Sequence, residues 1–119
     1  MKMNVLIADK VDAGCRDILE KAGVVADEKH GLSPQQLLQI IGEYDGLIVR
    51  SSTTVTEELI DAAPRLRVIG RAGTGVDNID VAAATRSGIV VTNTPGGNSV
   101  SAAELTFGML MSLARNIPQ

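Results

Sequence analysis

The residues best suited to chemistry in this 119-residue sequence lie in three polar segments, each of which directly follows a short apolar run. The segments are RSST from Arg50, RAGTGVDN from Arg71 and NTPGGNS from Asn93. Consecutive backbone N–H groups in a glycine-rich turn form a concave site for anionic oxygens, and an arginine adds a charge-assisted hydrogen bond. The three segments together predict a site for a small, polyanionic molecule.

The segment VIGRAGTGVDNID, residues 68–80, also invites comparison with a dinucleotide-binding loop. That fingerprint is G-x-G-x-x-G, and its third glycine allows the following helix to pack closely against the strand. Here Gly73 and Gly75 are followed by Asn78 at the third position, and starting the pattern at Gly70 does not restore it. The sequence therefore favours an anion-holding loop over a pyrophosphate site.

The candidate ligand contacts share a position just after an apolar run. They are Arg50, Ser51, Arg71, the backbone amides of Ala72, Gly73, Thr74 and Gly75, the Thr74 side chain, Asn93 and Asn98. Each has a purely structural alternative. The glycines can serve only as turn residues, and the arginines can be solvated or paired with Asp77 and Asp80. Asn78 can cap the short helix before Asp80, and Asn98 with Ser99 can begin the last helix.

Other reactive residue types do not join this group. His30 lies in a loop far from the three segments, and Cys15 is expected to be a small core or boundary residue. No metal-ligand spacing occurs in the sequence. Hydride transfer needs a nicotinamide site with a general acid or base beside it, and these segments supply neither. We expect the chain by itself to bind a ligand and not to turn it over.

The composition is that of a globular protein, with 45% hydrophobic and 21% charged residues. The net charge of −3 and the pI near 5.0 argue against binding to nucleic acid. One cysteine excludes an internal disulfide and predicts a reducing, cytoplasmic location. The opening MKMNVLIADK is too short in its apolar run for a signal peptide, and no segment approaches the roughly 18 apolar residues of a membrane span.

Short apolar runs alternate with helical patterns, which predicts an α/β fold with a parallel sheet. Strands are expected at residues 4–9, 24–28, 46–50, 66–70 and 88–92, and helices at 11–22, 32–44, 54–63, 78–88 and 100–116. We predict a flavodoxin-like, five-stranded sheet of order 2-1-3-4-5, flanked by helices, which right-handed crossovers allow. Ligands bind at the carboxyl ends of such strands, where the three polar segments lie.

The sequence also indicates where several helices begin. Ser33 before Pro34 predicts the start of the second helix, and Thr56 that of the third. For the last helix, Ser101 and Glu104 have the spacing of a capping box, with Val100 and Leu105 as a hydrophobic staple. This helix is apolar nearly all round. Its side chains Leu105, Met109, Leu110 and Leu113 are expected to form an exposed patch, and a homodimer through the helix from Ser101 to Arg115 would cover them.

The segments DGLIVRSSTTVT and LRVIGRAGTGVDNIDVAAATRSGIVVTNTPGGNSVSAAELTFGMLMSLAR resemble the NAD-dependent D-2-hydroxyacid dehydrogenases, in particular the branch that opens the phosphorylated route to L-serine. The resemblance covers essentially the whole chain. It implies a substrate-binding domain at residues 1–98 and a linking helix at 99–119 that enters a Rossmann domain. It also implies NAD as cofactor and a small phosphorylated 2-hydroxy acid as substrate.

The resemblance assigns roles to individual residues. Arg50 and Arg71 match positions at the anionic end of the substrate, the backbone from Ala72 to Gly75 matches the loop that holds its carboxylate, and Asn98 matches a substrate-side contact. Thr74 matches a residue that touches the cofactor. The family's catalytic arginine, glutamate and histidine, and its cofactor fingerprint, belong to later regions, so no catalytic residue is expected here and the chain alone should be inactive.

Three alternatives stay open at this point. Closely related alternatives are the substrate domains of hydroxypyruvate or glyoxylate reductases, whose substrates carry no phosphate; the two arginines and the quoted motifs favour the phosphate. A flavodoxin-like module that binds a small anion without catalysis would use the same loops. An engineered scaffold derived from the substrate domain would have the same sequence features, as would a natural truncation.

Overall fold

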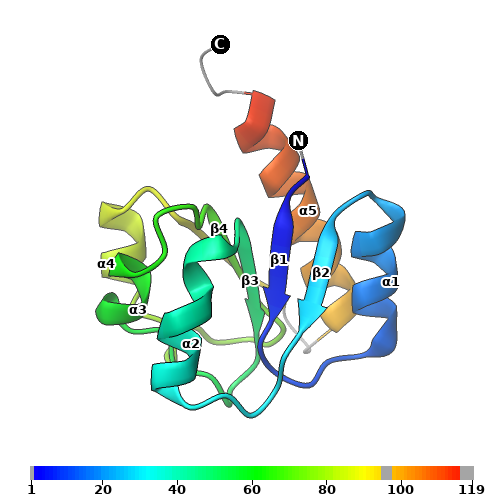
Figure 1. The fold of residues 1–119 in the computed structure, drawn as a ribbon. Helices are drawn as coiled ribbons and strands as arrows, with labels where there is room; N and C mark the ends of the chain where they lie inside the picture. The colour runs from blue at the N-terminus through cyan, green and yellow to red at the C-terminus, as the bar shows by residue number, and fades with distance from the viewer. Residues whose placement is uncertain (1, 95–97, 116–119) are drawn as a thin grey trace.

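The computed structural model describes residues 2–94 and 98–115, with side chains described as far as Leu113. One parallel sheet lies in the middle of the molecule, with α1 and α5 on one face and α2, α3 and α4 on the other (Figure 1). No helix in these residues is long and apolar enough to cross a membrane. The predicted NTPGGNS segment lies partly outside the description, because residues 95–97 are not covered.

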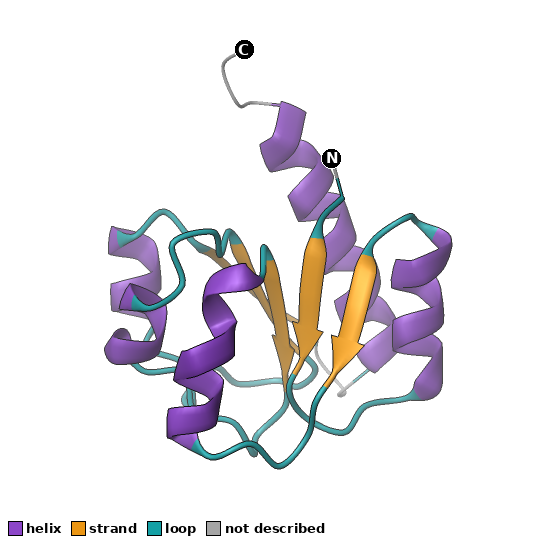
Figure 2. Ribbon diagram, viewed as in Figure 1, coloured by secondary structure: helices purple, strands orange, loops and turns teal. Residues whose placement is uncertain are grey.

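The five strands have the order β2-β1-β3-β4-β5, which confirms the predicted flavodoxin-like sheet. They are β1 (Asn4–Ile7), β2 (Val25–Glu28), β3 (Gly46–Val49), β4 (Val68–Arg71) and β5 (Val90–Asn93). All neighbours pair in parallel, so the carboxyl ends of the strands share one edge, which is the lower edge in Figure 2. Every strand is one or two residues shorter than its apolar run predicted, and β4 and β5 each end one residue later than predicted, at Arg71 and Asn93.

The helices are α1 (Ala13–Lys21), α2 (Pro34–Ile40), α3 (Glu57–Asp61), α4 (Val81–Arg86) and α5 (Ser99–Arg115), with a 3₁₀ turn η1 (Ile41–Glu43) after α2. The predicted start of α2 is confirmed. The Ser33 hydroxyl accepts a hydrogen bond from the Gln36 backbone amide, and the Gln36 side chain accepts one from the Ser33 backbone amide. Thr56 caps α3 as predicted, by accepting from the Leu59 amide.

The start of α5 differs from the prediction. The Asn98 side chain accepts a hydrogen bond from the Ser101 amide at 3.1 Å, so the helix begins at Ser99 and Ser101 lies within its first turn. The predicted capping box of Ser101 and Glu104 is therefore wrong, and so is the staple with Val100. Asparagine is as good an N-cap as serine, and Asn98 comes first along the chain. The alternative in which Asn98 and Ser99 begin the helix is the one observed.

Two hydrophobic clusters cover the two faces of the sheet, because side chains alternate along each strand. On β3, Leu47 and Val49 face the layer of α2, α3 and α4, whereas Ile48 faces α1 and α5. Cys15 is fully buried in the second cluster, as predicted for a core residue. Burial, with the negative charges of Glu28 and Asp12, raises the pKa of its thiol to about 11.

Helix α5 packs onto its own sheet. A Cβ added on Gly70 would overlap the Thr106 hydroxyl, whereas one on Gly46 would only reach contact distance, 3.4 Å, from Thr106 Cγ2. Leu110 is fully buried there, so its predicted place in an exposed patch is wrong; Leu105 is exposed at 45%. An all-round apolar helix does not reveal which side packs; here Thr106 packs against Gly70, where a larger residue would not fit.

Candidate anion-binding site

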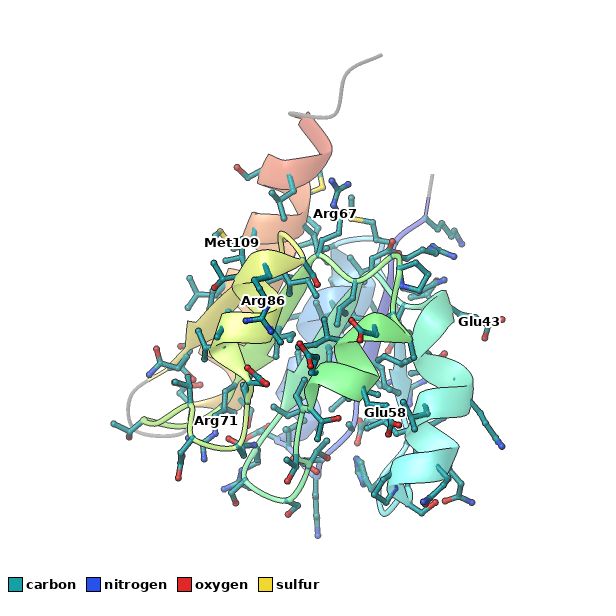
Figure 3. All side chains as sticks on the ribbon, turned by 90° about the vertical axis from the view of Figure 1, so that its left-hand side faces the viewer. Glu43, Glu58, Arg67, Arg71, Arg86 and Met109 are labelled. Atoms are coloured by element: carbon teal, nitrogen blue, oxygen red, sulfur yellow. The ribbon has the colours of Figure 1, made fainter. Side chains whose placement is uncertain are left out.

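The polar segments converge at the carboxyl edge of the sheet. Register pairs Val49 with Arg71 and Arg71 with Asn93, so the residues that follow β3, β4 and β5 lie side by side. Figure 3 shows Arg71 at this lower edge. Arg67, which directly precedes β4, lies near the opposite edge. A parallel sheet imposes this arrangement, because all its strands end on one side.

The glycine-rich loop after β4 wraps around Arg71. Nη1 of Arg71 donates a hydrogen bond to the Gly75 carbonyl at 2.5 Å, so the guanidinium lies over its own loop. An ideal Cβ at residue 73 would approach this Nη1 to 3.0 Å. A side chain at residue 73 would therefore require the guanidinium to shift, whereas the backbone of Gly73 has no positive φ that would call for glycine. The buried Nε of Arg71 has no hydrogen-bond partner among the described residues.

Three backbone amides of this loop remain available to a ligand. The Ala72 amide donates to the Val49 carbonyl at 2.9 Å and so continues the sheet. The N–H groups of Gly73, Thr74 and Gly75 donate to no acceptor in residues 2–94 and 98–115. Ala72 thus fixes where the loop leaves the sheet, and the next three residues present the donors that an anion would accept.

Asparagine side chains link the loops to one another. Nδ2 of Asn78 donates to the carbonyls of Arg50 and Thr53, at 2.6 and 2.7 Å, and so joins the loop after β3 to the loop after β4. Nδ2 of Asn93 donates to the Thr74 carbonyl at 2.6 Å. Asn78 does not cap α4, because the Asp80 side chain takes that role by accepting from the Ala83 amide.

The end of β5 is tied to the start of α5 in the same way. The buried Thr94 hydroxyl lies 3.1 Å from the Asn98 carbonyl and 3.4 Å from the Arg71 carbonyl, and can donate to either. Asn98 itself is exposed at the end of α5 that faces the loops. Its side-chain oxygen is occupied by the cap of α5, so only its amide group is left to meet a ligand.

The two site arginines donate hydrogen bonds to backbone carbonyls. Arg50 is exposed, and its Nη1 donates to the Lys10 carbonyl at 3.3 Å; Ser51 next to it is exposed as well. In the part of the chain that the structure describes, neither Arg50 nor Arg71 forms an ion pair. The alternative that Asp77 and Asp80 pair with them is not realised among these residues.

One residue at this edge was not among the sequence candidates. Asp9 is only 6% exposed and accepts three hydrogen bonds from the loop after β3. Its signal in the sequence is a single acidic residue directly after the buried run VLIA. Asp77 also lies at this edge, where its Oδ1 would be 3.1 Å from a Cβ on Gly75. His30 follows β2, whose carboxyl end shares this edge, and it pairs with Glu28 at 2.9 Å. No group of three or more potential metal ligands occurs among the described residues.

The same loop does not fit a dinucleotide. In a dinucleotide-binding fold the glycine loop runs directly into a helix whose N-terminus faces the pyrophosphate. Here residues 76–80 separate Gly75 from α4, and the carboxylate of Asp80 already caps that helix. A negative charge at that position would repel a pyrophosphate. The geometry of the described loop therefore favours a small anion over the phosphates of NAD.

A flavodoxin-like domain with arginines and a glycine-rich loop at its carboxyl edge is the class that fold and site define. The chain belongs to the D-isomer specific 2-hydroxyacid dehydrogenases, because the model of that family's catalytic domain matches residues 5–115. It is 58% identical over 115 residues to D-3-phosphoglycerate dehydrogenase of Homo sapiens, and 53% identical over 114 residues to that of Synechocystis sp.. These matches cover 97% and 96% of this chain.

The chain spans only 22% and 20% of the lengths of those two relatives. Among solved structures, it resembles the NAD⁺-bound 3-phosphoglycerate dehydrogenase of Entamoeba histolytica, with a TM-score of 0.75 and 37% identity. That likeness covers 92% of this chain and 38% of the other. It therefore extends over nearly all of this fold but little more than a third of the solved one.

Proposed function

We propose that this chain is the substrate-binding part of an NAD-dependent D-3-phosphoglycerate dehydrogenase. Such an enzyme oxidises 3-phosphoglycerate to 3-phosphohydroxypyruvate at the start of the phosphorylated route to L-serine. The observation that supports this best is the convergence of Arg50 and Arg71, without ion-pair partners among the described residues, on three backbone amides with no protein acceptor there. The substrate carries a phosphate and a carboxylate, and these groups match the two kinds of donor.

In this proposal the arginines hold the anionic end of the substrate, and the amides of Gly73, Thr74 and Gly75 hold the carboxylate. Arginine suits a phosphate because its planar guanidinium can donate two parallel hydrogen bonds. Ser51 and Asn98 lie on either side of this cluster and complete the polar lining. Ala72 contributes through its position and not through its amide, which the sheet already uses.

NAD is the proposed cofactor of the longer enzyme and would accept the hydride in the oxidation. Since the described residues do not fit its pyrophosphate, the proposed role of this chain is to bind and orient the substrate. Thr74, whose side chain is exposed at the outer end of its loop, is the proposed point of contact with the cofactor. The chain alone is expected to show no dehydrogenase activity.

The test is a calorimetric titration of this chain with 3-phosphoglycerate at low ionic strength, with glycerate as the control that lacks only the phosphate. Low salt is chosen because exposed charges are screened at higher ionic strength. We expect saturable, weak binding of 3-phosphoglycerate and much weaker binding of glycerate. A folded chain that binds both equally, or neither, would contradict the proposed half-site.

Three further predictions stay open. The first is a cytoplasmic location. The second is a domain boundary after residue 98. The third is a homodimer through α5, for which the exposed apolar side chains are now Leu105 and Met111. A solution mass of one chain at high protein concentration would contradict the homodimer.

A further inference from the structure

The buried carboxylate of Asp9 lies level with Arg50. Register pairs Ile7 with Ile48, and the Ala8 amide donates to the Ile48 carbonyl at 3.0 Å, so the chain continues beside β3 beyond the end of β1. Two residues further along, Asp9 reaches the first residues of the loop after β3. A charged group in this place is costly unless it is hydrogen-bonded.

Asp9 is hydrogen-bonded on both oxygens. Oδ2 accepts from the Arg50 amide at 2.6 Å and from the Thr53 amide at 3.1 Å, and Oδ1 accepts from the Thr53 hydroxyl at 2.6 Å. The three donors come from the two ends of the Arg50–Thr53 segment. A single carboxylate therefore closes this segment into a compact turn, and charge-assisted bonds of this kind are stronger than neutral ones.

The opposite side of the same turn is held by Asn78. Its Nδ2 group donates to the carbonyls of Arg50 and Thr53, the same two residues whose amides bond to Asp9. The turn is thus clamped between a buried acceptor from the end of β1 and a donor from the loop after β4. Arg50 extends from a backbone whose amide and carbonyl are both fixed by side chains distant in sequence.

We propose that Asp9 is a positioning residue for Arg50. It does not touch the substrate; it fixes the backbone from which Arg50 reaches the phosphate, and so sets how well the chain distinguishes a phosphorylated from an unphosphorylated hydroxy acid. This inference rests on the proposed function of Arg50. What it adds is that selectivity for the phosphate depends on Asp9, a buried acid with the same sign of charge as the ligand.

The test compares Asp9→Asn with the wild-type chain by two measurements. The first is the ratio of the dissociation constants for glycerate and 3-phosphoglycerate, which partial unfolding would leave unchanged because it weakens both equally. The second is amide hydrogen exchange at Arg50 and Thr53, followed by NMR. We expect the ratio to fall at least about fivefold and the exchange to accelerate at least about tenfold, as the loss of a charge-assisted bond predicts.

Asp17→Asn is the matched control, because it removes the same charge from an exposed position on α1; it should change neither quantity. Thr53→Val is the second variant. It keeps the carboxylate and the shape of the side chain but removes the hydroxyl donor, so it should shift both quantities in the same direction by less. If Asp9→Asn does not fold, Thr53→Val decides the test by itself.

Two results would overturn the inference, and they are distinguishable. Retention of the wild-type selectivity ratio by a folded Asp9→Asn chain would refute the positioning role alone. A wild-type chain with no preference for 3-phosphoglycerate would refute the proposed function, and the inference with it, even where exchange at Arg50 and Thr53 still depends on Asp9.

Discussion

Arginines lie at both edges of the sheet, but their surroundings differ. At the amino edge, Arg65 pairs with Asp45 at 3.1 Å, and Asp45 also accepts the Asn4 amide at 2.8 Å. Arg67 lies beside them, half-buried, with its backbone used in the sheet. At the carboxyl edge, Arg50 and Arg71 have no acidic partner among the described residues, and the amides beside them have no acceptor there.

The presence of a hollow does not by itself identify the candidate site. A hollow of about 540 Å³ lies at the amino edge, between Asp45, Arg65, Arg67 and the C-terminal end of α4 at Ser87 and Gly88. An anion there would meet a carboxylate and the negative end of a helix. At the carboxyl edge it would meet two arginines without ion pairs and three amides without acceptors, as far as the described residues show. Charge balance and available donors, more than volume, mark the candidate site.

Replacing the arginines one by one would test this comparison most severely. Arg50→Ala and Arg71→Ala should each weaken 3-phosphoglycerate binding by roughly 10- to 150-fold, which corresponds to the loss of about 1.5–3 kcal/mol for a hydrogen bond to a charged group. Glycerate binding should change less. Calorimetric titration at low salt measures both.

Arg65→Ala and Arg67→Ala at the amino edge are the controls, and both should bind 3-phosphoglycerate as the wild-type chain does. If they weaken binding as much as the first pair, the contrast between the edges disappears. If all four variants bind phosphorylated and unphosphorylated ligands with equal losses, the arginines do not recognise the phosphate.

A glycine at each edge allows a second test. Gly73→Ala brings a Cβ to 3.0 Å from Nη1 of Arg71 and should displace the guanidinium, weakening binding roughly threefold to tenfold, up to about 1.4 kcal/mol. Gly88→Ala instead strains a backbone with φ of +75° after α4 and should cost about 1 kcal/mol of stability. Thermal unfolding and titration of both variants separate the effects.

We expect the two variants to affect different quantities. Gly73→Ala should change ligand affinity more than stability, and Gly88→Ala should change stability only. Binding that is lost in Gly88→Ala while the chain remains folded would mean that the two edges are coupled. In that case the glycine loop could not be treated as a separate unit.

Asp45→Asn probes the structural role assigned to the amino edge. The change weakens the bonds of a partly buried carboxylate to the Asn4 amide and to Arg65, and should lower the free energy of unfolding by about 1 kcal/mol. Affinity for 3-phosphoglycerate should not change. Denaturant unfolding checks the first expectation and titration the second. An altered ligand affinity would argue against a purely structural amino edge.

Asn98→Asp gives the smallest expected effect and separates two roles of one residue. Aspartate keeps the side-chain oxygen that caps α5, so stability should stay within about 0.5 kcal/mol of wild type. A new negative charge near the anionic ligand should weaken binding roughly twofold to fourfold. Unchanged affinity in titration would show that Asn98 is a cap and not a ligand contact.

Predictions from the sequence were confirmed where a local pattern was compatible with only one structure. Alternating apolar runs and helical patterns gave the strand order, and Ser33 and Thr56 gave two helix starts. The predictions failed at α5, where Asn98 and Ser101 are both good caps and the apolar pattern has no preferred side. They also missed Asp9, because an acid after a strand has no fixed meaning until its neighbours in space are known.

The sequence by itself determined the α/β fold, the order of its strands and the identity of the loops that meet at their carboxyl ends, since hydrophobic periodicity and right-handed crossovers are local rules. Only the tertiary structure decided which donors those loops leave free. The Ala72 amide is taken by Val49, Asn78 joins two loops, and Asp9 holds the turn of Arg50. These bonds join residues far apart in the chain, and their pairing depends on strand register.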